Sequence, residues 1–146
     1  RNTIPSFKKI CPNSFLKSYN QDTQTVTFTN ASQIMFFAEN YAQDKELNRW
    51  KGLEVNGFLL EEVNELQEVS FNKAIERSGS LILNNQPPKL ILATCNPAQN
   101  WVKEKFYDRF KANTLPDKWL YIPAKIADNP FIPKDYLEGL KELPAY

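Results

Sequence analysis

Polar residues follow two apolar runs in this sequence, at the points where predicted strands end. Glu61 and Glu62 come directly after the run FLL at 58–60, and the triplet Thr-Cys-Asn at 94–96 follows the run LILA at 90–93. In an open parallel sheet, ligands bind beyond the carboxyl ends of the strands, because loops and helix N-termini converge there. If the two strands are near neighbours, two carboxylates and a hydroxyl–amide pair face one crevice.

A strand that ends in two acids has the physical form of a Walker B element. One carboxylate holds Mg²⁺, usually through water, and the next polarises the water that attacks the γ-phosphate. Consecutive residues suit this division because strand side chains alternate and the turn at the strand end separates them. Glu61, Glu62 and Glu65 could instead simply favour the first turn of the following helix. The residues alone leave both interpretations open.

Thr94 and Asn96 are candidates for a polar sensor at the tip of the second strand. In that role they detect the γ-phosphate or its attacking water. The simpler interpretation of Asn96 is that it caps a helix beginning at Pro97, where proline suits the first helical position. Both interpretations can hold at once.

Other side chains are weaker candidates for ligand contacts. Arg77 and Arg1 could stabilise the charge of a nucleotide, although a surface arginine is the simpler interpretation of each. Trp101, Phe106 and Phe110 have helical spacing, which is typical of packing rather than of base stacking. Basic residues at 103–111 could touch DNA phosphates, but they alternate with acids, as on a solvated helix face.

Composition excludes several kinds of chemistry. The chain has no His, so His-based nucleophile activation and His-ligated zinc are excluded, and its two cysteines cannot build a zinc site or a disulfide framework alone. A net charge of +1 gives no global attraction to nucleic acid or an anionic membrane. No run approaches the ~18 apolar residues of a membrane span, and no leader is visible, so we expect a cytosolic protein without a membrane partner.

The chain has 146 residues, of which 42% are apolar and 24% are charged. This length and composition predict one α/β domain over residues 1–146. A predicted strand is followed by a helix that ends at Gly79 and by a second strand, and this order predicts a βαβ unit. Both strands are unbroken apolar runs, which are typical of a sheet that is covered on both faces. In the first third of the chain we predict a weak helix at 6–19 broken at Pro12, a hairpin of 23–29 and 33–38, and a helix around 41–50. The middle is predicted to contain a strand at 57–62, a helix at 66–78 and a strand at 89–95. The last third is predicted to contain a helix from Pro97 to near Asn113, a strand at 119–122 and a helix from Pro133 to about Leu143.

Four blocks of the chain resemble the ATPase region of tailed-phage large terminases, the motors that package viral DNA. The order and spacing of the blocks are more specific than any one of them. They are RNTIPSFKK at the start, KGLEVNGFLLEEVNEL at 51–66, LATCNPAQNWVKEKFYDRF at 92–110 and DNPFIP at 128–133.

The resemblance implies a partly parallel sheet of the P-loop NTPase (ASCE, RecA-like) type with flanking helices. It gives Glu61 the metal role, Glu62 the catalytic role, and Thr94 with Asn96 the coupling of hydrolysis to movement. It further implies ATP as substrate, Mg²⁺, translocation of double-stranded DNA into the capsid, a homo-oligomeric ring on the portal protein, a small terminase partner, and a location in the cytoplasm of the bacterial host.

The sequence departs from the family pattern in two places. None of the four glycines, Gly52, Gly57, Gly79 and Gly139, belongs to a phosphate-cradling P-loop, and the nuclease half expected after DNPFIP is absent. We therefore expect the downstream part of a terminase ATPase domain, with 116–146 as a C-terminal extension. Such a fragment has an unfilled sheet edge or gap and little or no ATPase activity by itself.

Two other functions stay open at this stage. The first is a non-enzymatic α/β assembly or interaction module without a nucleotide site, which binds a partner through its aromatic-rich tail. The second is a metal-dependent nuclease built on Glu61 and Glu62. The nuclease hypothesis is the weaker of the two, because two adjacent acids without further aspartates at other strand ends rarely hold two metals.

Overall fold

The computed structural model describes residues 3–82, 84–85 and 87–141. The chain divides into two compact units, which are described separately. Unit 1 comprises Arg1–Leu60 and Val69–Ala93, and unit 2 comprises Glu61–Glu68 and Thr94–Tyr146. In the described part of the chain, no helix combines the length and the apolar character needed to cross a membrane.

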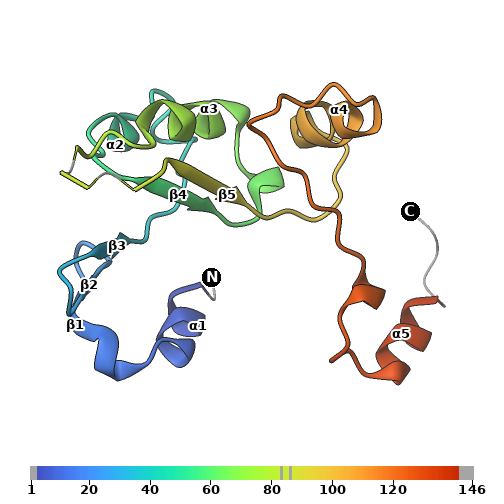
Figure 1. Cartoon of the computed structure of the whole chain (residues 1–146), viewed down its shortest axis with the longest axis horizontal. Helices are drawn as coiled ribbons and strands as arrows, with labels where there is room; N and C mark the ends of the chain where they lie inside the picture. The colour runs from blue at the N-terminus through green and yellow to red at the C-terminus, as the bar shows by residue number, and fades with distance from the viewer. Residues whose placement is uncertain (1–2, 83, 86, 142–146) are drawn as a thin grey trace. The chain divides into compact units, whose positions relative to one another are not determined.

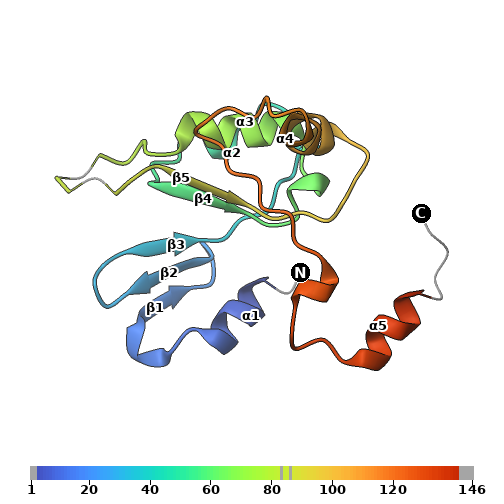
Figure 2. The same ribbon diagram turned by 45° about the vertical axis from the view of Figure 1, so that its right-hand side comes forward.

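Unit 1 contains an antiparallel sheet in the order β1-β2-β3 (Figure 2). Its strands are β1 (Leu16–Asn20), β2 (Thr25–Phe28) and β3 (Gln33–Met35). The predicted hairpin is confirmed, with Val26 opposite Ile34. Strand β1 was not predicted, because its sequence LKSYN lacks a clear apolar alternation.

The predicted helix at 6–19 was wrong beyond Pro12. Helix α1 (Thr3–Ile10) ends before the proline, and a 3₁₀ turn, η1 (Asn13–Phe15), leads into β1. Proline lacks an N–H group and disfavours helical geometry in the residue before it, so it separates the two elements.

The predicted βαβ unit is confirmed. Strands β4 (Gly57–Leu60) and β5 (Leu90–Ala93) pair in parallel, with Leu60 opposite Ala93, and α3 (Glu68–Arg77) connects them. Helices α2 (Asn48–Lys51) and α3 lie on one side of this sheet (Figure 1). Gly79 ends the connection from α3 with a φ of 74°, a left-handed conformation that glycine adopts without strain.

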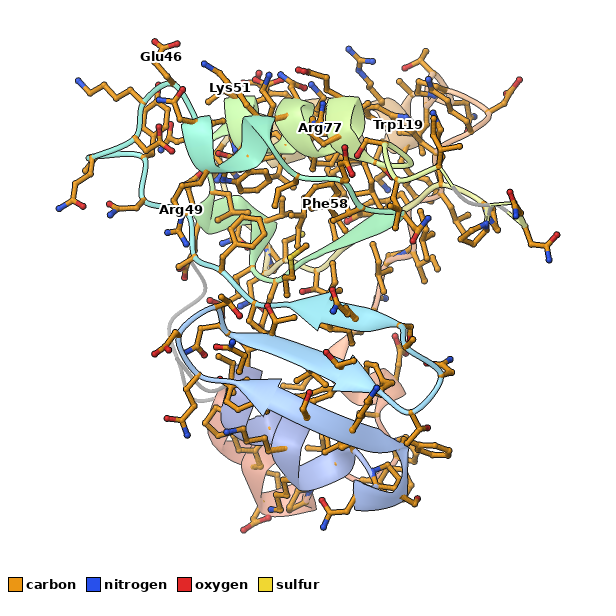
Figure 3. The ribbon with its side chains drawn as sticks, turned by 90° about the vertical axis from the view of Figure 1, so that its left-hand side faces the viewer. Glu46, Arg49, Lys51, Phe58, Arg77 and Trp119 are labelled. Atoms are coloured by element: carbon orange, nitrogen blue, oxygen red, sulfur yellow. The ribbon has the colours of Figure 1, made fainter. Side chains whose placement is uncertain are left out.

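The core of unit 1 lies between the parallel sheet and its two helices. The Trp50 ring stacks on Phe58 at a centroid distance of 5.8 Å, and Phe58 extends from β4 toward the helices (Figure 3). Phe71 and Ala74 of α3 are buried. Burial of such side chains stabilises the unit by roughly 1.5–3 kcal/mol for each large residue.

The opposite face of the parallel sheet is uncovered among the described residues. Leu59, Leu90 and Leu92 are 66%, 62% and 54% exposed. The expectation that both faces are covered is therefore wrong for this part of the chain. The chain is mixed α/β, with a small parallel sheet and flanking helices.

Unit 2 contains a 3₁₀ turn and a longer helix interrupted by a π-helical segment. The turn is η2 (Val63–Glu65), and the helix runs from Trp101 through the π-helical η3 (Lys103–Tyr107) into α4 (Asp108–Lys111). Two further elements follow, η4 (Ile126–Asp128) and α5 (Lys134–Lys141). The predicted C-terminal helix is confirmed over Lys134–Lys141, and its predicted end near Leu143 lies outside the described residues.

The predicted strand at 119–122 is wrong: within the described residues this segment has no strand partner. It runs alongside the helix instead. Trp119 stacks on Phe106 at 5.0 Å, and Tyr121 packs on Phe110 at 5.1 Å. The predicted packing role of the two phenylalanines is confirmed, since their rings contact other aromatic rings of the same unit.

Candidate functional site

Residues that directly follow β4 and β5 contact each other in unit 2. We call residues 61–65 the acid turn and residues 94–96 the threonine segment. The N–H of Val63 donates to the carbonyl oxygen of Thr94 at 2.8 Å, and the N–H of Glu62 donates to Thr94 Oγ1 at 3.4 Å. The main chain at Glu62 therefore lies beside Thr94, while the prediction that both carboxylates and the threonine face one crevice stays a prediction.

The acid turn contains an unusual backbone conformation at Glu62. This residue has φ 52° and ψ 51°, in the left-handed region that non-glycine residues seldom occupy. Such a conformation costs roughly 1 kcal/mol or more and persists where surrounding contacts over-determine it. Here the neighbour Val63 is 1% exposed and carries the bond to Thr94, so burial and hydrogen bonding fix the turn.

The two glutamates differ in solvent exposure. The Glu61 side chain is exposed, whereas Glu62 is half-buried. An exposed carboxylate can reach a hydrated cation, and a half-buried neighbour is better placed to contact a single water molecule. The difference is consistent with two separate roles, which stay predictions.

Asn64 is a site residue that the sequence did not reveal. Its side-chain Oδ1 accepts the N–H of Asn96 at 3.3 Å, and its carbonyl oxygen accepts Asn100 Nδ2 at 2.8 Å. These bonds connect positions 32 and 36 residues apart. No local spacing rule links such distant positions, so no sequence signal identifies them.

The predicted helix start at Pro97 was wrong. The helix begins at Trp101, and Asn100 Oδ1 accepts the N–H of Val102 at 3.1 Å, as an N-cap does. Asn96 is exposed and contributes its main-chain N–H to Asn64, so it does not cap a helix. Its sensor role stays a prediction.

Arg77 makes a structural contact within unit 1. Its Nε and Nη2 donate to the carbonyl oxygen of Leu53 at 2.9 and 2.6 Å, and Ser80 Oγ donates to the same oxygen at 3.0 Å. This contact favours the structural interpretation, while the nucleotide role of Arg77 stays a prediction. Arg1 lies outside the described residues.

Two of the basic side chains of the helix are paired with acids. Lys103 contacts both carboxylate oxygens of Asp108 at 2.8 Å, and this hydrogen bond raises the pKa of Lys103. Lys105 lies 2.5 Å from Glu68. Both lysines are half-buried and paired, so these contacts are structural, and a role of either lysine in binding DNA stays a prediction.

Cys95 lies in the middle of the threonine segment but is poorly suited to act as a nucleophile. Although the residue is exposed, partial desolvation raises the pKa of its thiol above the ordinary value. The reactive form of cysteine is the thiolate, so a raised pKa leaves the thiol protonated at neutral pH. The chemistry of the site therefore depends on its carboxylate, hydroxyl and amide groups.

Mg²⁺ in nucleotide sites is commonly held by one or two carboxylates, together with waters and substrate phosphates. Within the described residues, no three acidic or thiol side chains gather into a cage that could hold a metal ion. One exposed carboxylate, Glu61, beside a second, Glu62, fits the nucleotide-dependent mode. Glu61 would then be the metal ligand from this chain.

A comparison with protein families matches residues 11–146 to the family described as phage terminase large subunit. Comparisons with curated proteins and with solved structures give no match. The family match covers most of the chain and includes both the acid turn and the threonine segment. The chain therefore belongs to the phage terminase large subunit family, a membership that implies a role in DNA packaging.

Proposed function

We propose that this chain is the downstream part of a terminase motor domain, which couples ATP hydrolysis to translocation of double-stranded DNA into the capsid. The observation that carries the proposal is the contact between the acid turn and Thr94, formed directly after two parallel strands. The contact supports the proposal because it brings the residues after two parallel strands together at the edge of the sheet where ligands of such sheets bind.

In the proposed reaction, Glu62 orients the attacking water and accepts its proton. The water oxygen bonds to the γ-phosphorus while the bond from phosphorus to the β,γ-bridging oxygen breaks, giving ADP and inorganic phosphate. The proton held on Glu62 then passes to phosphate or solvent. Mg²⁺, when bound beside Glu61, supplies the positive charge that offsets the phosphate oxygens.

Thr94 and Asn96 are proposed as the groups that respond to the state of the nucleotide. Thr94 already contacts the N–H of Glu62, and Asn96 contacts Asn64 on the same turn. A change at the γ-phosphate that moves Glu62 therefore alters these contacts first. In this proposal, ATP hydrolysis displaces the threonine segment through these two hydrogen bonds.

The wider assignment is also part of the proposal. We propose a fold of the P-loop NTPase (ASCE, RecA-like) type, in which a segment outside residues 1–146 supplies the phosphate-binding loop. The uncovered apolar face of β4 and β5 supports this, since another element of the complete domain would shield it. The proposed partners are double-stranded DNA, the portal protein, the small terminase subunit and further copies in a ring, in the cytoplasm of the bacterial host.

The deciding experiment uses the full-length product of the gene that encodes this chain. Glu62→Gln removes the proton acceptor while preserving size, so we expect ATP turnover to be abolished and ATP binding to be retained. Glu104→Gln, the same change at an exposed helix position, is the control and should leave turnover unchanged. Unchanged turnover in Glu62→Gln would remove the catalytic assignment. Absence of any ATP binding would favour the non-enzymatic assembly module.

A further inference from the structure

The start of the helix at 101–111 contacts the acid turn and the residues after it through side-chain donors. Asn100 Nδ2 donates to the carbonyl oxygen of Asn64 at 2.8 Å. Trp101 Nε1 donates to the carbonyl oxygen of Leu66 at 2.9 Å. Both acceptors are main-chain oxygens, so these bonds fix the path of the backbone just after Glu62.

Asn100 differs from Trp101 because its side-chain carboxamide makes two hydrogen bonds, one as a donor and one as an acceptor. While Nδ2 donates to Asn64, Oδ1 accepts the N–H of Val102 at 3.1 Å and caps the helix. The carboxamide is planar and rigid, so its two bonds cannot shift independently. A displacement of the acid turn therefore reaches the first turn of the helix through one group.

Two of the neighbouring side-chain contacts are weaker than the bond from Asn100 to Asn64. Asn64 Oδ1 accepts the N–H of Asn96 at 3.3 Å, which is at the long end for a hydrogen bond, and at an exposed position. The Lys105–Glu68 pair has side chains that are 20% and 47% exposed, and exposed ion pairs contribute little. At 2.8 Å the bond from Asn100 to Asn64 is shorter than the bond from Asn96 to Asn64 and equal in length to the main-chain bond from Val63 to Thr94.

We propose that Asn100 is a positioning residue, which holds the acid turn in place and transmits its displacement to the helix at 101–111. This inference rests on the proposed function, because the displacement follows ATP hydrolysis at Glu62. It adds a specific mechanical connection between the predicted catalytic carboxylate and the helix.

The test is Asn100→Asp in the full-length gene product. Aspartate keeps an oxygen that can cap the helix but loses the amide donor to Asn64. The matched control is Gln99→Glu, the same amide-to-acid change at the adjacent exposed residue. Steady-state ATP hydrolysis and the length of DNA translocated per ATP are measured for both variants, and thermal unfolding checks that each folds.

We expect Asn100→Asp to lower kcat about tenfold or more, since small misplacements of catalytic groups have large effects on rate. The KM for ATP should stay near the wild-type value, and the DNA length translocated per ATP should fall. Gln99→Glu should match wild type in all three quantities. A merely structural role would lower the melting temperature without changing the DNA length per ATP of the folded protein.

Equal kcat and equal DNA length per ATP in Asn100→Asp and Gln99→Glu would overturn the inference. If Asn100→Asp does not fold, Asn100→Ser decides in its place, because serine caps a helix without adding charge. Wild-type kcat and DNA length per ATP in Asn100→Ser would then refute it. Failure of the proposed function is recognised separately, by unchanged turnover in Glu62→Gln.

Discussion

The N–H of Val63 donates a 2.8 Å hydrogen bond to the carbonyl oxygen of Thr94. This main-chain bond joins the residue after the two glutamates to the residue after β5. It does not depend on the Thr94 side chain, whose hydroxyl accepts a separate and longer bond of 3.4 Å from the N–H of Glu62. Placement of the acid turn and chemistry at Thr94 can therefore be separated by substitution.

Thr94→Val should reduce ATP turnover of the full-length gene product with little effect on stability. Valine preserves the shape and the backbone bond but removes the hydroxyl that contacts Glu62. Because that bond is long and exposed, its loss should cost no more than about 0.5–1 kcal/mol in urea unfolding. Thr94→Ser, which keeps the hydroxyl, is the control and should retain turnover. Wild-type turnover in Thr94→Val would contradict a sensor role.

Much of the fold could be predicted because its signals are local. The unbroken apolar run before Glu61 and the run before Thr94 identified two strands, and the intervening helix identified their parallel pairing. The adjacency of Glu62 and Thr94 followed from that topology. Local sequence patterns were sufficient where the positions of the strands along the chain determine which residues meet, as they do for β4 and β5.

The rest depended on contacts that no local pattern encodes. Asn-Pro at 96–97 has the features of a helix start, but Asn100 caps the helix instead. The bond from Asn100 to Asn64 spans 36 residues. Trp119 and Tyr121 alternate as in a strand, yet they pack on helix aromatics. In each case tertiary packing selected among locally acceptable structures.

Gly57→Ala should destabilise the parallel sheet. A Cβ at Gly57 would lie 2.5 Å from the carbonyl oxygen of Leu90, a backbone atom that can move only if the strands separate. We expect a loss of about 1–3 kcal/mol in the free energy of unfolding, as for other overpacked positions. Gly52→Ala is the control, because no atom lies within 4 Å of a Cβ there. Equal urea midpoints for the two variants would refute the predicted clash.

Arg77→Lys should lower stability even without nucleotide. The guanidinium donates twice to the carbonyl oxygen of Leu53, and a single ammonium cannot reproduce this fork from the same position. We expect a loss of about 1–2 kcal/mol in thermal or urea unfolding. Arg49→Lys, at an exposed arginine labelled with Arg77 in Figure 3, is the control and should be neutral. A neutral Arg77→Lys would return Arg77 to the set of candidate nucleotide ligands.

The Asp44 carboxylate should make the stability of unit 1 depend on pH. Its carboxylate accepts the backbone N–H of Asn48 at 2.8 Å and that of Arg49 at 3.1 Å. These bonds, the one from Asn48 first, hold the pKa of Asp44 below its ordinary value of 3.8. The folded chain therefore favours the charged form. This contribution is fully present above the ordinary value and is lost as the pH falls through the lower pKa of the folded chain.

Asp44→Asn tests this dependence, because the amide keeps one acceptor oxygen and cannot titrate. We expect the variant to be less stable than wild type at neutral pH, with a difference that shrinks as the pH falls below the ordinary pKa of 3.8 and through the lower pKa of the folded chain. Urea midpoints measured across that range for wild type, Asp44→Asn and the exposed control Asp117→Asn provide the comparison. A constant difference between wild type and Asp44→Asn at every pH would show that the carboxylate contributes by shape alone, since only a titrating group makes the difference depend on pH.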